Sequence, residues 1–112
     1  MKICISSQGK DLNAKIDPRF GRCKYFIFAD ADTLQLEAVE NPNADIMGGA
    51  GIQSAQFVVD KKAAAVITGN MGPNASGVLS KAAVKVFTGT VDKTVRQAIE
   101  EYKQSKLTEK TE

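Results

Sequence analysis

Three cations and a cysteine lie close together in one short segment of this chain. Arg19, Arg22 and Lys24 fall within six residues. Asp17 is the carboxylate of this segment, and Cys23 stands among the cations. Such a cluster favours an anion, and neighbouring positive charge lowers the pKa of a thiol. We therefore expect an anion site here, with thiolate character at Cys23. A solvated surface loop whose charges bind nothing is the alternative.

A second segment combines glycines, asparagines and a proline. The apolar run 63–67 shows no polar alternation, which is typical of a strand buried on both faces. The run breaks at residues 69–74 (GNMGPN), and Asn74 is a natural N-cap for a helix over 75–83. A buried strand that enters a helix through a glycine-rich turn presents free backbone N–H groups to a ligand. A tight connection that binds nothing is the alternative.

Two methionines add soft sulfur to these loops. Met71 lies in the glycine-rich turn, and Met47 precedes the glycine cluster 48–51 (GGAG). A thioether can ligate a soft metal ion, although packing or a flexible loop position is the simpler explanation for each methionine.

Composition excludes several classes of function. The 112 residues suit one domain, and the formal net charge of +2 is too small to indicate a nucleic-acid partner. No apolar run approaches the roughly 20 residues that span a bilayer, and the start of the chain turns polar too early for a signal peptide. The two cysteines are not spaced as a CxxC pair, which fits a reducing cytoplasm.

The residue types give little support to enzyme chemistry. The chain contains no histidine, which removes the commonest general base and the commonest metal ligand. Asp30 and Asp32 are spaced to share a face, but turn formation explains them more simply. A metal-dependent nuclease needs carboxylates inside the sheet, and the expected inner strands have none. We therefore expect a protein that is not an enzyme.

The elements that must position these loops follow the order β-β-β-α-β-α-β-α. Apolar runs and alternation predict strands over 2–6, 25–29, 34–39, 63–68 and 84–88. Helical spacing predicts helices over 52–59, 75–83 and 95–102, the last one capped by Thr90 or Asp92. The whole chain, 1–112, is expected to form a single domain in which about 103–112 is a polar, fraying tail.

This order has a geometric consequence. The first three strands form an antiparallel meander, and a helix joins the fourth strand to the fifth, so those two run parallel. We expect a five-stranded mixed sheet of order 3-2-1-4-5, with strand 2 antiparallel and helices on its faces. The loops 7–24, 41–51 and 69–74 then meet at one edge of the sheet. Open α/β sheets bind ligands at such an edge.

Four motifs occur in a fixed order along the chain. They are 17–26 (DPRFGRCKYF), 40–42 (ENP), 48–56 (GGAGIQSAQ) and 69–75 (GNMGPNA), and the closing run 90–98 (TVDKTVRQA) follows them. Together they resemble the dinitrogenase iron–molybdenum cofactor biosynthesis family over nearly the whole chain. The resemblance implies a ribonuclease H-like three-layer α/β fold. Some members carry iron–sulfur precursors or finished cofactor to nitrogenase. Relatives often have histidine where Arg19 stands, so imidazole ligation is excluded here.

Three functions therefore remain open. The first is a non-enzymatic carrier or sensor for an anionic iron–sulfur or iron–molybdenum-type cluster or its precursor, bound labilely because two cysteines cannot wrap a cluster. Its metal ligand would be Cys23, and its partners would be cofactor-assembly proteins, with no nucleic acid and no membrane. The second is a metal-free module for a phosphorylated or other anionic small molecule, and the third is a purely structural or interaction domain. We expect a monomer or weak homodimer.

The expected cofactor-binding residues all come from the three loops. They are Arg19, Phe20, Gly21, Arg22, Cys23, Gly49, Gly51, Gly69, Asn70, Met71, Gly72 and Asn74.

Overall fold

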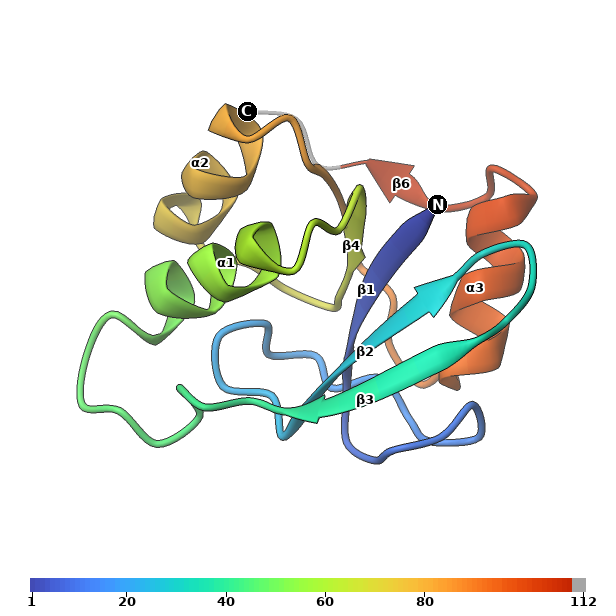
Figure 1. Cartoon of the computed structure of the whole chain (residues 1–112), viewed down its shortest axis with the longest axis horizontal. Coiled ribbons are helices and arrows are strands. Elements are labelled where there is room, and N and C mark those ends of the chain that lie inside the picture. Colours follow the sequence, from blue (N-terminus) through green and yellow to red (C-terminus); the bar gives the residue numbers. More distant parts are fainter. Residues whose placement is uncertain (110–112) are drawn as a thin grey trace.

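The computed structural model describes residues 1–109 and has three layers, a twisted sheet between helices (Figure 1). The strands are β1 (Lys2–Ser7), β2 (Tyr25–Asp30), β3 (Leu36–Glu40), β4 (Ala65–Ile67), β5 (Lys85–Thr88) and β6 (Thr108–Glu109). The helices are α1 (Ala50–Asp60), α2 (Pro73–Lys81) and α3 (Val95–Lys103). Within the described residues, none of these helices has the length and apolar content to cross a membrane.

The sheet has the order β3-β2-β1-β4-β5-β6. β1 pairs antiparallel with β2 and parallel with β4, and β2 pairs antiparallel with β3. The expected order 3-2-1-4-5 and the antiparallel second strand are thus confirmed.

The expected number of five strands is wrong, because β6 adds a sixth at the far side of β5. β6 lies in the segment expected to be a polar tail, and residues 110–112 of that segment are outside the described part of the chain. The two residues of β6 are exposed and polar, so the sequence has no apolar pattern that would predict this strand.

Alternation along β1 divides the apolar side chains between the two faces of the sheet. Ile3 and Ile5 point to a cluster with Val95 and Ile99 of α3. Cys4 points to the other face, where α1 and α2 cover a cluster that includes several phenylalanines. Because each face is closed by helices, the polar loops at the strand ends are the places left for a site.

Helix starts differ from the expectation in two places. Thr94 caps α3, and its hydroxyl and the Gln97 side chain form a complete capping box, so neither Thr90 nor Asp92 is the cap. α2 begins at Pro73 with Gly72 as N-cap, so Asn74 lies inside the first turn. Proline favours the first helical position because it needs no hydrogen-bond partner for a backbone N–H.

Candidate functional site

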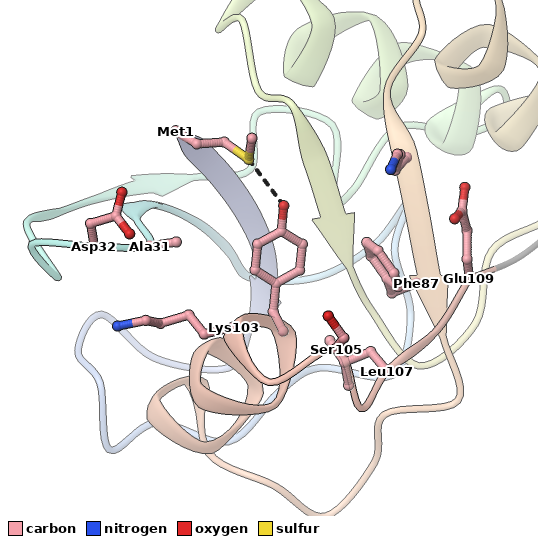
Figure 2. A pocket seen from close by; sticks show the side chains of 10 residues that line it. Met1, Ala31, Asp32, Phe87, Lys103, Ser105, Leu107 and Glu109 are labelled. Atoms are coloured by element: carbon pink, nitrogen blue, oxygen red, sulfur yellow. Dashed lines mark hydrogen bonds between the residues drawn. The ribbon is translucent and has the colours of Figure 1, made fainter.

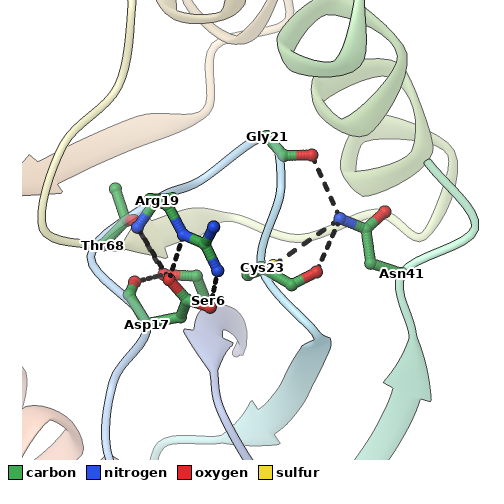
Figure 3. A network of polar contacts seen from close by, with 7 residues as sticks. All are labelled: Ser6, Asp17, Arg19, Gly21, Cys23, Asn41 and Thr68. Atoms are coloured by element: carbon green, nitrogen blue, oxygen red, sulfur yellow. Dashed lines mark hydrogen bonds and ion pairs between the residues drawn. The ribbon is translucent and has the colours of Figure 1, made fainter. Parts of the chain in front are cut away.

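A polar network fixes the start of the 17–23 loop to the carboxyl ends of β1 and β4 (Figure 3). Ser6 Oγ lies 2.7 Å from both the backbone oxygen of Asp17 and Thr68 Oγ1. The backbone N–H of Asp17 also donates to the Ser6 carbonyl at 2.9 Å. All three residues are buried, so these hydrogen bonds replace water that the chain has excluded. The loop therefore begins from a fixed point.

Close backbone contacts hold the rest of this loop. Asn70 donates its backbone N–H to the Pro18 carbonyl at 2.7 Å, and Phe20 donates to the Asn70 carbonyl at 3.3 Å. A Cβ added to Gly69 would lie 2.7 Å from Pro18 Cα, and one added to Gly21 would lie 2.9 Å from the backbone of α1. Glycine is required at both positions because no side chain fits between the backbones.

These contacts leave a pocket of about 440 Å³ between the loop and the starts of α1 and α2. Its walls are Arg19, Phe20, Gly21, Arg22, Gly49, Ala50, Gly51, Ile52, Asn70, Met71, Gly72, Pro73, Asn74 and Ala75. This set contains every expected binding residue except Cys23 and Gly69. Sequence reasoning did not select Ala50, Ile52, Pro73 and Ala75, whose side chains carry no chemistry. Their shared signal is their position in the first turn of a helix.

Both helices that reach this pocket start without a side-chain cap. Gly49 is the N-cap of α1, in a left-handed conformation with φ of 73°, and Gly72 is the N-cap of α2. Within residues 1–109, no N-cap side chain accepts a hydrogen bond from the first turn of either helix, and neither first turn contains an acidic residue. α3, which is not part of this pocket, is fully capped by Thr94. Pro73 has no backbone N–H, so the first donors that these helices offer an anion are the N–H groups of Ala50 in α1 and Asn74 in α2.

The two arginines of the pocket are already engaged by the protein. The Arg19 guanidinium donates to Asp17 through Nε and one terminal nitrogen, both at 3.3 Å. The Arg22 guanidinium donates to the carbonyls of Ala44 at 3.1 Å and Ile46 at 2.9 Å. Among residues 1–109 Arg22 makes no ion pair, although Glu40 and Asp45 line a neighbouring cavity with it, whereas the charge of Arg19 is paired with a carboxylate.

The expected thiolate character of Cys23 is wrong. Cys23 is buried in the core cluster beneath α1 and α2, and this burial, together with the negative charge of Asp17, raises the pKa of its thiol to about 12. Cations adjacent in the sequence do not offset this desolvation. Asn41 covers the cysteine, with Nδ2 donating to its carbonyl at 3.0 Å and lying 3.8 Å from its sulfur (Figure 3). Cys4 is buried as well, and its pKa is also raised by burial.

The remaining soft and acidic groups give no preformed metal site. Met71 is buried and lines the pocket, whereas the side chain of Met47 is fully exposed. Among residues 1–109, no three histidine, cysteine, aspartate or glutamate side chains gather in a way that could hold a metal ion. A metal-containing ligand would have to bring most of its own ligands.

A larger cavity of about 580 Å³ lies at the opposite edge of the sheet (Figure 2). Phe87 and Tyr102 form an apolar wall there, with ring centroids 5.5 Å apart, and the Tyr102 hydroxyl donates to the sulfur of Met1 at 3.0 Å. Charges of both signs surround it, with Lys103 and Asp32 among them. Because no helix N-terminus faces this cavity within the described chain, it lacks the anion-binding chemistry of the first pocket.

Comparisons with known proteins identify the family and similar folds. The model of the family described as "Dinitrogenase iron-molybdenum cofactor" matches residues 1–105. The apo form of the orange protein from Desulfovibrio gigas is similar in structure, with a TM-score of 0.95, 33% identity and coverage of 98% of this chain and 92% of that one. A Thermotoga structure described as a candidate NifB protein of the DUF35 family has a TM-score of 0.81 and 37% identity, covering 96% and 91%. An uncharacterized protein of Methanocaldococcus jannaschii is 28% identical over 94 residues, 79% of this chain and 80% of that protein.

The buried thiol of Cys23 predicts a loss of stability at alkaline pH. Its pKa is about 12 in the folded protein, against an ordinary value of 9.0, so the unfolded chain loses this proton first. The contribution of the protonated Cys23 thiol to the free energy of unfolding is complete below about pH 9. It falls by about 1.4 kcal/mol per pH unit as the pH rises toward 12. Urea unfolding of wild type and Cys23→Ala should give free energies of unfolding whose difference shrinks from about pH 8 to about pH 11.

Val58→Ala provides the matched control, because it removes a fully buried side chain that does not titrate. Its difference from wild type should stay constant over the same pH range. A constant difference for Cys23→Ala as well would contradict the assigned pKa.

Proposed function

The chain belongs to the dinitrogenase iron–molybdenum cofactor family, and we propose that it is a non-enzymatic carrier of an anionic iron–sulfur or iron–molybdenum-type cluster or its precursor. The observation that carries this proposal is the convergence of two uncapped helix N-termini and the positive charge of Arg22 on one pocket. Backbone N–H groups and a guanidinium stabilise negative charge without forming a covalent bond. Such a site binds a preassembled anion and can release it again.

The donor set also explains why binding would be labile. Iron–sulfur clusters held permanently by proteins are normally ligated by several thiolates. The two cysteines here are both buried, so the pocket offers hydrogen bonds and small, close walls in place of a ring of sulfur ligands. A carrier needs this property, because its cargo must leave for the next protein.

Cys23 remains our proposed metal ligand, under conditions set by its surroundings. The Asn41 side chain would have to move aside, and the Cys23 thiol, whose pKa is raised to about 12, would have to lose its proton. Metal binding drives such a proton loss, at the expense of affinity. Ligation through Cys23 would therefore be weak and would strengthen as the pH rises.

The relatives support a binding role. The orange protein structure is described as an apo form, the term for a protein without its bound ligand. The family description names the dinitrogenase iron–molybdenum cofactor, and the Thermotoga structure is described as a candidate NifB protein. We propose cofactor-assembly proteins as partners. The ribonuclease H-like class, a single domain, a monomer or weak homodimer and a place in the reducing cytoplasm complete the proposal.

The second candidate is a module that binds a metal-free anion such as a phosphorylated small molecule. It is favoured by the same helix N-termini, because backbone N–H groups bind phosphate oxygens as readily as other anions. The two candidates differ in their need for a thiol and for metal, so anaerobic reconstitution with iron and sulfide separates them.

Removing the two arginines should weaken anion binding without unfolding the protein. We expect Arg19→Ala/Arg22→Ala to bind tripolyphosphate about tenfold more weakly than wild type, with a larger difference at low salt, because about 1.4 kcal/mol of charge-assisted binding is lost. Isothermal titration calorimetry measures this affinity. Lys81→Ala/Arg96→Ala, which removes two exposed cations of α2 and α3, should bind as wild type does. Unfolding of the Arg19→Ala/Arg22→Ala variant would show that the arginines are structural and would contradict their assignment to anion binding.

Anaerobic reconstitution with iron and sulfide should distinguish the two candidate functions. We expect visible charge-transfer absorption in wild type and Cys4→Ala, and its loss in Cys23→Ala, because Cys23 is the cysteine in the loop of the pocket. Iron and sulfide analysis of the desalted proteins measures the stoichiometry. Equal, weak and non-stoichiometric absorption in all three proteins would favour the metal-free module.

A further inference from the structure

We propose that Asp17 is a counter-charge beside the pocket, held against its wall residue Arg19, which lowers the affinity of the pocket for an anion and so promotes release of the cargo. The inference rests on the proposed function, because it concerns the same pocket. The Asp17 carboxylate is 2% exposed and is bonded to the guanidinium of Arg19, which lines the pocket. A buried carboxylate beside an anion site is unexpected, because like charges repel strongly where water is excluded.

Asp17 accepts three hydrogen bonds from a single residue. The backbone N–H of Arg19 donates to Oδ1 at 3.0 Å, and the guanidinium donates to Oδ1 and Oδ2 at 3.3 Å (Figure 3). The carboxylate and the guanidinium together carry no net charge. The attraction of Arg19, which lines the pocket, for an anion is therefore opposed by the carboxylate that it contacts.

Asp17 cannot follow Arg19 toward a ligand. Both its backbone N–H and its carbonyl are hydrogen-bonded to Ser6 at the end of β1. The side chain of Arg19 is 68% exposed, so it is free to reorient while the carboxylate stays in place. When an anion draws the guanidinium away, Asp17 loses its partner inside the protein, and this loss opposes binding.

The field of Asp17 reaches other groups of the loop. Its negative charge is the second cause, after burial, of the raised pKa of Cys23. The carboxylate thus disfavours negative charge on the thiol of the loop, as we propose that it does for an anion in the pocket. A purely structural role for Asp17, orienting Arg19 and the loop, is the competing explanation.

The two explanations predict opposite effects for Asp17→Asn, which keeps the shape and an acceptor oxygen for Arg19 but removes the charge. We expect this variant to bind tripolyphosphate about three- to tenfold more tightly than wild type at low salt, and to release it more slowly in stopped-flow measurements. Asp60→Asn is the matched control, because it makes the same change in net charge at the exposed end of α1. Its affinity should stay within about twofold of wild type.

A second pair of variants keeps the test valid if Asp17→Asn alone folds poorly. In the Arg19→Gln background, the carboxylate has no guanidinium left to orient and keeps only its bond to the backbone N–H of residue 19. Our proposal predicts that Asp17→Asn/Arg19→Gln binds tripolyphosphate more tightly than Arg19→Gln, whereas the orienting role predicts equal or weaker binding. Unchanged or weaker binding in both comparisons overturns the counter-charge while leaving the proposed function standing. A wild-type protein that does not bind tripolyphosphate at all overturns the anion pocket and this inference together.

Discussion

The close approach of the 17–23 loop to the backbone after β4 is the constraint on which the rest of the site depends. Pro18 and Phe20 exchange backbone hydrogen bonds with Asn70, and Gly69 leaves no room for a side chain at this crossing. Gly21 makes an equally close contact with the start of α1. The loop therefore forms a wall in front of two helix N-termini, although more than forty residues of chain separate Arg19 from Asn70.

The affinity of the site for an anion depends on which of its polar groups already have hydrogen-bond or charge partners within the protein. The start of α3 is closed by its own capping box, whereas α1 and α2 begin with glycines that offer no cap. Arg22 is occupied by loop carbonyls and Arg19 by a buried carboxylate. Hydrogen-bond donors thus converge on the pocket, but part of its charge is held back by the protein. This balance suits a protein that must bind an anion and later release it.

Much of the architecture could be predicted because it rests on local patterns. The unbroken apolar run before Gly69 indicates a buried strand, and the helix that follows makes β4 and β5 parallel, which brings the three loops to one edge. The burial of individual loop side chains could not be predicted from such local patterns. Cys23 has cations on either side in the sequence, yet its side chain turns into the core under Asn41. Asp17 is likewise a polar loop residue that the sequence gives no reason to bury.

Our central claim is that anions bind at the starts of α1 and α2, and amide chemical shifts measured by NMR during a titration with tripolyphosphate test it most directly. We predict that the backbone N–H signals of Gly51, Ile52, Asn74 and Ala75 shift together and saturate at one affinity, because these groups face the pocket without a cap. The signal of Gln97, which the Thr94 hydroxyl already caps, should stay in place. Shifts confined to the opposite edge of the sheet, at Ala31 and Lys103, would contradict the account.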